Sequence, residues 1–118
     1  MSLEYDLNTE LIIDRLNTSM ESASLSTLDN MLEDIRPYVP YNTGELDSSA
    51  VIDESSMNIV WDTDYAKYVY DLPKDSNFNR DVHPNATSDW VNEARQAYED
   101  KWIDDFRESF RGSFGGDE

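Results

Sequence analysis

The sequence predicts an α+β fold with a long N-terminal helix, an antiparallel β-meander of three to four strands, and a long C-terminal helix packed on one face of the sheet. Apolar residues recur at helical spacing at both ends of the chain, whereas short runs between them alternate between two faces. Pro37 and Pro40 close the first helical pattern, because proline lacks a backbone donor. With 118 residues, we expect one domain spanning residues 1–118, flexible at residues 1–8 and 112–118.

The first helix is expected over residues 9–36. Its apolar positions recur with acids between them, at Ile12, Leu16, Met20, Ala23, Leu28, Met31, Leu32 and Ile35. Asn8 or Thr9 can cap its start through a side-chain oxygen. Residues 17–22 are poor helix formers, since short polar side chains compete for backbone groups, and would be the place for a kink.

A sharp corner follows at residues 40–49, where Asn42 and Gly44 favour a turn. Residues 46–54 and 57–61 are predicted to form two strands of a hairpin, because their side chains alternate between two faces. Residues 65–70 have the aromatic and β-branched content of a third strand, although Ala66 and Lys67 also allow a helical turn there.

Residues 71–84 show no periodicity and are predicted to be a long exposed loop. Its one large apolar side chain, Phe78, stands between two asparagines and gains little by being exposed. We expect Phe78 to dock onto a neighbouring subunit or a connector protein, the alternative being that it folds back on its own sheet.

The C-terminal helix is expected from residue 87 onwards, capped by Thr87 or Ser88 and with Asp89 in its first turn. Its apolar stripe comprises Val91, Ala94, Tyr98, Trp102, Phe106 and Phe110, widened by Trp90, Ala97 and Ile103. So small a domain has little interior to cover this stripe. We therefore predict that part of the set Tyr98, Trp102, Phe106 and Phe110 meets another subunit.

The chain carries 26 acidic and 9 basic residues, a net charge of -17. This charge repels phosphate backbones and argues against sequence-specific nucleic-acid binding. A surface rich in aspartate and poor in lysine is typical of a halophile, since the Debye length falls to about 3 Å at about 1 M salt. An ordinary acidic protein is the alternative.

No cysteine is present, which excludes disulfides, thiolate metal sites and a cysteine nucleophile. The sequence shows neither an export signal nor an apolar run approaching the roughly 20 residues that span a membrane.

The sequence contains only weak patterns of catalytic or metal-binding residues. His83 has no second histidine or cysteine with which to share a metal, and we expect it to hydrogen-bond the start of the last helix. Oxygen-bearing side chains alternate at Asp75, Asn77, Asn79 and Asp81 as calcium ligands do. An EF-hand needs glycine and glutamate where this chain has Arg80 and Ala86. We predict no enzyme, no cofactor and no metal, and keep as the alternative function a small acidic metal-binding module or enzyme using this loop.

Three segments of the sequence match motifs of a known protein family. Residues 40–49 match P-x-x-T-G-x-L-x-x-S, residues 65–69 match Y-A-x-Y-V, and residues 83–90 precede a long amphipathic helix. In this order they resemble the minor capsid, neck and tail-completion proteins of long-tailed phages and their archaeal relatives, over about residues 37–110. The matching positions, which we expect to shape the corner and the sheet, are Thr43, Gly44, Leu46, Ser49, Tyr65, Ala66 and Tyr68.

The resemblance implies a virion structural protein without enzymatic activity, a subunit of a hexameric or dodecameric ring in the virion neck. The ring would join the portal complex to the tail tube and be assembled in the host cytoplasm. The implied partners are portal, adaptor or head-completion proteins and tail-tube or tail-terminator proteins. Genomic DNA would pass through without sequence-specific binding, and no membrane is involved. The net charge departs from the family and suggests a virus whose host keeps molar salt inside.

Overall fold

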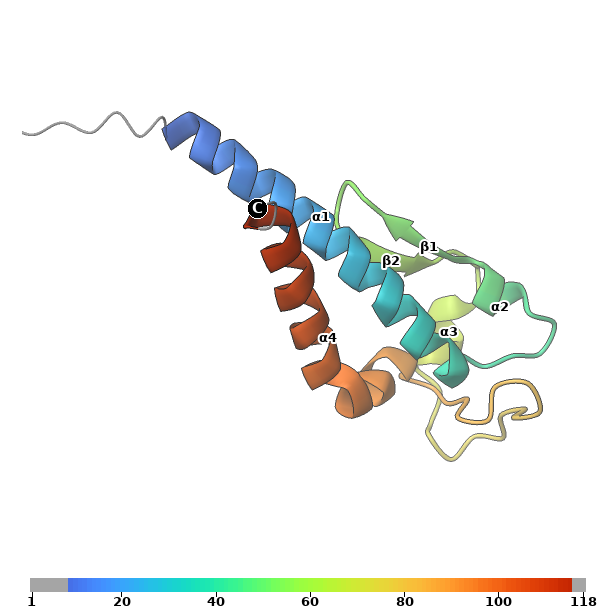
Figure 1. Ribbon diagram of the computed structural model, residues 1–118. Helices are drawn as coiled ribbons and strands as arrows, with labels where there is room; N and C mark the ends of the chain where they lie inside the picture. Colours follow the sequence, from blue (N-terminus) through green and yellow to red (C-terminus); the bar gives the residue numbers. More distant parts are fainter. Residues whose placement is uncertain (1–8, 116–118) are drawn as a thin grey trace, which may run out of the picture.

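The computed structural model describes residues 9–115, which form two long antiparallel helices with smaller elements gathered at one end (Figure 1). The elements in chain order are α1 (Thr9–Ile35), η1 (Arg36–Tyr38), α2 (Glu45–Ser48), β1 (Ala50–Asp53), β2 (Asn58–Trp61), α3 (Ala66–Tyr70) and α4 (Trp90–Phe114). The α+β class and both long helices are confirmed. The sheet has two antiparallel strands, so the predicted meander of three to four strands is wrong.

Helix α4 packs along α1, and the β-hairpin lies on the other side of α1 (Figure 1). The C-terminal helix was expected to pack on a face of the sheet, but its main contact is with α1. The start of α4 does approach the sheet, because the rings of Trp90 and Trp61 meet edge to face at 5.8 Å. The helix α1 thus forms the middle layer between α4 and the hairpin.

Helix α1 runs without interruption through residues 17–22, where a kink was conceivable. Its short side chains serve packing instead. Ser19 is buried against α4, and the hydroxyl oxygens of Ser19 and Ser113 lie 3.2 Å apart. The helix ends at Ile35, and Pro37 lies in the following 3-10 turn η1. Asn8, one of the two expected caps, lies outside the described residues.

The corner holds a helical turn where the start of a strand was predicted. Gly44 adopts a left-handed conformation with φ of 88°, and α2 follows directly. The backbone N–H of Ser48 donates to the Gly44 carbonyl at 2.9 Å, and the Ser48 hydroxyl donates to the same oxygen at 2.8 Å. Leu46 thereby turns into the core, and the first strand begins only at Ala50.

The hairpin has the predicted alternation. Ala50 pairs with Trp61 and Asp53 with Asn58, so that Ile52 and Ile59 lie opposite each other on the core side. Val51 and Val60 point to solvent. Met57, expected in the second strand, lies in the turn with φ of 55°.

Residues 66–70 form the short helix α3 instead of a third strand. Ala66, Val69 and Tyr70 all face the core, and their spacing of three and one residues is that of a helix face. Tyr68 falls between them and is 70% exposed. Burial of one helical face thus outweighs the β-propensity of the aromatic residues.

The irregular loop expected over residues 71–84 extends to Asp89, and α4 begins only at Trp90. Neither Thr87 nor Ser88 caps it. The N–H of Thr87 donates to the Tyr38 carbonyl and that of Asp89 to the Tyr70 carbonyl, both at 3.0 Å, which holds this segment outside the helix. Asp89 occupies the N-cap position with φ of 56°. At its other end α4 continues to Phe114, past the residue 112 at which flexibility was expected, and residues 116–118 lie outside the described residues.

The core lies where α1 ends and α4 begins. Its buried members are Ile35, Val39, Leu46, Ala66, Trp90, Ala94 and Trp102. Trp90 is the largest of the fully buried side chains and also meets Tyr70 edge to face at 4.6 Å. Among the helices of residues 9–115, none combines the length and the apolar character needed to cross a membrane.

Candidate functional site

The first and third sequence motifs are joined at the corner. The rings of Tyr41 and His83 meet edge to face at 4.9 Å, and His83 Nδ1 donates to the Val39 carbonyl at 2.7 Å. His83 was expected to bond the start of the last helix, and that expectation is wrong. Its ring instead ties the loop before α4 to the end of η1.

The second motif joins the same unit. The Tyr65 hydroxyl donates to Glu45 Oε1 at 3.1 Å, which links the start of α3 to α2. Desolvation of the phenol, together with this hydrogen bond and the charge of Glu45, raises the pKa of Tyr65. The three motifs, scattered over residues 40–90, therefore form one connected structure.

Most motif positions shape this structure. Thr43 Oγ1 accepts from the Glu45 N–H at 3.3 Å, and the Ser49 hydroxyl donates to the Leu46 carbonyl at 2.7 Å. A Cβ on Gly44 would lie 2.7 Å from the Tyr41 hydroxyl oxygen, so Tyr41 would have to shift, and the φ of 88° favours glycine in any case. Leu46 and Ala66 are buried, whereas the exposed ring of Tyr68 is available to a partner.

Beside these motifs is a hollow of about 590 Å³, named here the corner hollow. Its walls come from the corner, from α3 and from the loop, at Pro40, Tyr41, Asn42, Thr43, Glu45, Leu46, Tyr65, Val69, Asn77, Phe78 and Asn79. Phe78 is half-buried here, and the Arg80 guanidinium carbon lies 5.9 Å from its ring centre. Phe78 thus lies against the corner of its own chain, away from the sheet, with part of its ring still exposed.

The acidic loop shows local turns rather than a coordination shell. The Asp81 N–H donates to Asn79 Oδ1 at 2.9 Å, and the Arg80 guanidinium donates to the Ala86 carbonyl at 3.1 Å. Lys74 pairs with Glu93 of α4 and lies 3.7 Å from Asp89. Within residues 9–115, no three histidine or carboxylate side chains gather closely enough to hold a metal ion. The geometry gives the metal-binding alternative no support.

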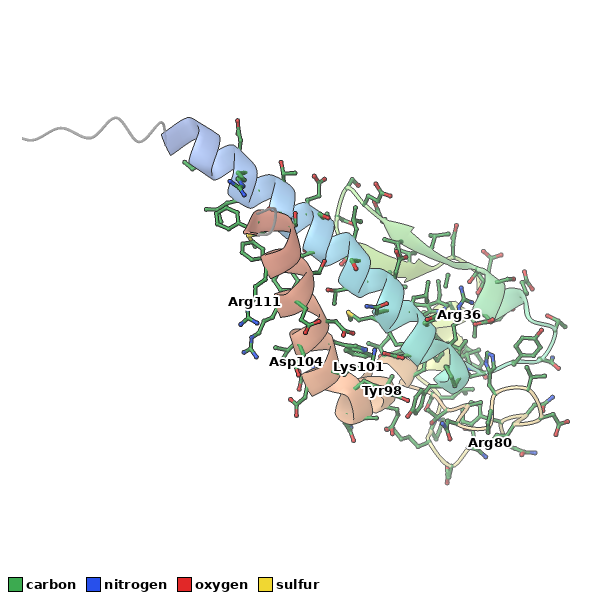
Figure 2. The ribbon with its side chains drawn as sticks, viewed as in Figure 1. Arg36, Arg80, Tyr98, Lys101, Asp104 and Arg111 are labelled. Carbon is green, nitrogen blue, oxygen red and sulfur yellow. The ribbon has the colours of Figure 1, made fainter. Side chains whose placement is uncertain are left out.

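Trp102, one of the predicted interface residues, belongs to the chain's own core. Its indole N–H donates to Asp34 Oδ2 at 2.9 Å, and Lys101 Nζ lies 2.8 Å from the same oxygen. Hydrogen bonds to Asp34 and then to Asp105 raise the pKa of Lys101. Figure 2 shows Lys101 on the α1 side of α4, and Asp104 and Arg111 on the opposite side. Tyr98 stacks on Trp102 with ring centres 6.3 Å apart.

Phe106 and Phe110 are half-buried and continue the stripe along α4. Their rings stack at 6.3 Å, and Phe110 stacks on Phe114 at 5.4 Å. Arg15 of α1 covers the ring of Phe114 and donates to its carbonyl. The sequence reasoning missed Phe114, although its step of four from Phe110 is a signal that could have found it.

A second hollow of about 550 Å³ runs along α4 and is named here the α4 groove. Met31, Val91, Trp102, Ile103 and Phe106 line it together with the charged side chains Arg95, Glu99 and Arg107. Of these, only Trp102 and Phe106 were singled out from the sequence as interface residues. The groove places them beside Ile103, which is 45% exposed.

Comparisons with known proteins give one match. A family model described as minor capsid protein matches residues 11–110. A comparison with curated proteins and another with solved structures each found no match. The matched residues span both long helices and all three motifs that meet at the corner. The chain therefore belongs to the minor capsid protein family and is a structural component of a virion.

Proposed function

We propose that this minor capsid protein is a ring-forming subunit of the head–tail connector, located in the virion neck or at the end of the tail. Its partners would be portal, adaptor or head-completion proteins on one side and tail-tube or tail-terminator proteins on the other. The observation that carries this proposal is the α4 groove, an apolar hollow left open along one helix of a protein whose role is structural. A subunit that assembles needs such a surface.

The distribution of charge suits a DNA conduit. The few basic side chains are largely engaged by acids, as in the pairs of Arg36 with Asp47 at 3.1 Å and Lys67 with Asp71 at 2.6 Å. With 26 acidic against 9 basic residues the subunit repels phosphate on balance, so DNA could slide past it without adhering. The net charge of -17 acts in the same direction.

The same charge sets the conditions for assembly. Subunits carrying -17 each repel one another in dilute salt, whereas at about 1 M salt the Debye length of about 3 Å removes most of this repulsion. We therefore propose that the ring is built in a salt-rich cytoplasm, the host being a halophile. Assembly should therefore be favoured by salt, because screening removes the repulsion between whole subunits.

The test is reconstitution in molar salt, alone and with the portal and tail-tube proteins. We expect rings in electron micrographs, hexameric or dodecameric in number, and a label on the C-terminal residues that appears at the neck of the particle. A protein that stays monomeric and binds neither the connector nor the tail-tube proteins in molar salt would contradict the proposal. The position of the label relative to the head also separates a neck role from a tail-completion role.

A further inference from the structure

Three apolar side chains of α1, two near its start and one near its end, lie on one side of the helix, with the polar residues Ser24 and Thr27 between the second and the third. Ile13, Met20 and Met31 are separated by 7 and 11 residues, which are close to two and three whole turns. They therefore share one side of the helix. Ile13 and Met20 are 53% and 49% exposed, and Met31 lines the α4 groove. Among residues 9–115 no element covers this side of α1 at its N-terminal end, where we name Ile13 and Met20 the α1 tip.

The α1 tip and the α4 groove lie on the same side of the helical pair but at different ends. Met31 connects them, because it shares a side with the tip residues and also contacts the groove formed by Ile103 and Phe106. Near the tip, α1 meets the end of α4 through Ser19 and Ser113. The groove lies further along, where Trp102 bonds Asp34. The molecule thus has an exposed apolar ridge and, separately, an apolar groove.

The charged residues next to the tip side chains are acidic, whereas the groove has a small excess of positive charge, from Arg95 and Arg107 against Glu99. Asp14 and Glu21 each follow a tip residue directly, which places them about 100° around the helix, at the edge of the ridge. The groove carries Arg95 and Arg107, two of only nine basic residues in the chain. Arg95 lies 3.9 Å from Glu99, and Arg107 lies 3.4 Å from Asp104. Both pairs are exposed, and such pairs hold their partners weakly.

We propose that the α4 groove binds the α1 tip of a second copy of this chain. The inference rests on the proposed function, since it names the contact from which the ring would be built. If the tips of two chains met, Asp14 and Glu21 of one chain would face the same acidic residues of the other. If the tip of one chain binds the groove of another, these acids face Arg95 and Arg107. Because the two patches differ, the contact is head-to-tail, the kind that closes into a ring when the rotation per subunit permits.

Two charge-reversal variants test whether the groove binds the tip of a second copy. One variant carries Arg95→Glu with Arg107→Glu, and the other carries Asp14→Lys with Glu21→Lys. Each alone should self-associate at least about tenfold more weakly than the natural chain, since like charges then meet at every contact. Mixed in equal amounts, the two should associate again, because every tip then faces a groove of opposite charge. Sedimentation is measured at the lowest salt that supports assembly of the natural chain, since salt screens these pairs.

An apolar pair tests the surface. Ile103→Glu should abolish association, because it places a charge in the groove. Val51→Glu is the matched control, because Val51 is 53% exposed, close to the 45% of Ile103, and lies in the β-hairpin, on the other side of α1 from α4. The control should assemble as the natural chain does. Thermal unfolding of both monomers reports whether either change disturbs the fold.

The outcomes separate this inference from the proposed function. Rings that survive both charge variants and Ile103→Glu would overturn the inference and leave the ring-forming role intact. A natural chain that stays monomeric at every salt concentration would also overturn it, and a label at the neck would then assign the groove to a different protein. Association that depends on tip and groove, in a protein absent from the neck, would support the inference and refute the connector role.

Discussion

The two ends of the helical pair are built from the same helices but packed differently. At the corner end, Ile35, Val39 and Trp90 are fully buried. At the α1 tip, the buried positions are small or polar, as at Ser19 and Ala23, while Ile13 and Met20 are exposed. The difference follows from the number of layers. At the corner end, η1 and the hairpin also pack against α1, and Leu46 of α2 and Ala66 of α3 join the same core. At the tip, two helices cover only the stripe that each turns to the other.

This comparison assigns different roles to the two ends. Burial of large side chains supplies most of the free energy of folding, so the corner end should hold the chain folded by itself. The apolar surface at the tip and in the α4 groove contributes little to the isolated chain, because water still reaches it. That surface is available for binding.

The largest effect on folding should come from the corner end. Trp90→Ala removes a fully buried ring that meets Trp61 and Tyr70, and should lower the free energy of unfolding by about 3 to 5 kcal/mol. Ile13→Ala at the tip, where the side chain is 53% exposed, should change it by less than about 0.5 kcal/mol. Thermal unfolding of both monomers at one salt concentration makes the comparison. Equal shifts would show that the tip contributes to folding as the corner end does.

Two glycines provide the next contrast. Gly44→Ala should cost about 1 to 3 kcal/mol, because its φ of 88° is unfavourable for alanine and the new Cβ would meet Tyr41. Gly112→Ala, within α4 and with no atom near its new Cβ, should stabilise the chain by up to about 1 kcal/mol. The same substitution is therefore expected to lower the free energy of unfolding at Gly44 and to raise it at Gly112. A neutral Gly44→Ala would mean that the corner relaxes without loss.

The long helices, the hairpin and the irregular loop could be predicted from the sequence, because each depends on local periodicity. The misassigned elements depend on tertiary contacts. Residues 65–70 have strand-like composition, yet Ala66, Val69 and Tyr70 are buried together only as a helix. The helical turn α2 depends on the left-handed Gly44 and on the Ser48 hydroxyl, and the start of α4 on backbone bonds to Tyr38 and Tyr70.

The candidate sites were predicted in part. The motif residues were named from the sequence, but the contacts that join the three motifs could not be, since they depend on Tyr41 meeting His83 and Tyr65 meeting Glu45 across the chain. Trp102 looked like an interface residue because a stripe does not show which of its members an antiparallel neighbour covers. In the structure Asp34 of α1 accepts its N–H, and Ile103 is left exposed instead.

Phe78 lies between the two kinds of region, since it is half-buried in the corner hollow. Phe78→Ala should cost the monomer less than about 1.5 kcal/mol, because a half-exposed ring gives up only part of its burial energy. We expect ring formation or particle completion to fail, as the exposed part of the ring would dock onto a neighbour. Val82→Ala in the same loop is the control. A large loss of monomer stability with assembly intact would assign Phe78 to the core of its own chain.

The last effect concerns Tyr70, and it appears only at high pH. Burial, followed by the hydrogen bond to Asp89 and the charge of that carboxylate, raises the pKa of Tyr70 from 10.0 to about 12. The folded chain therefore holds the phenolic proton more tightly than the unfolded chain. This contribution to stability is complete below pH 10 and is lost as the pH rises from 10 to about 12.

In an absorbance titration of phenolate, one tyrosine should titrate last in the folded chain and rejoin the others in denaturant. Tyr70→Phe should remove that last step, and Asp89→Asn should shift it to lower pH. Far-ultraviolet circular dichroism, followed in parallel, shows whether the chain is still folded at each point. If all tyrosines of the folded chain titrate together near 10, the corner end does not shield Tyr70 from water, and the contrast between the two ends is weaker than burial indicates.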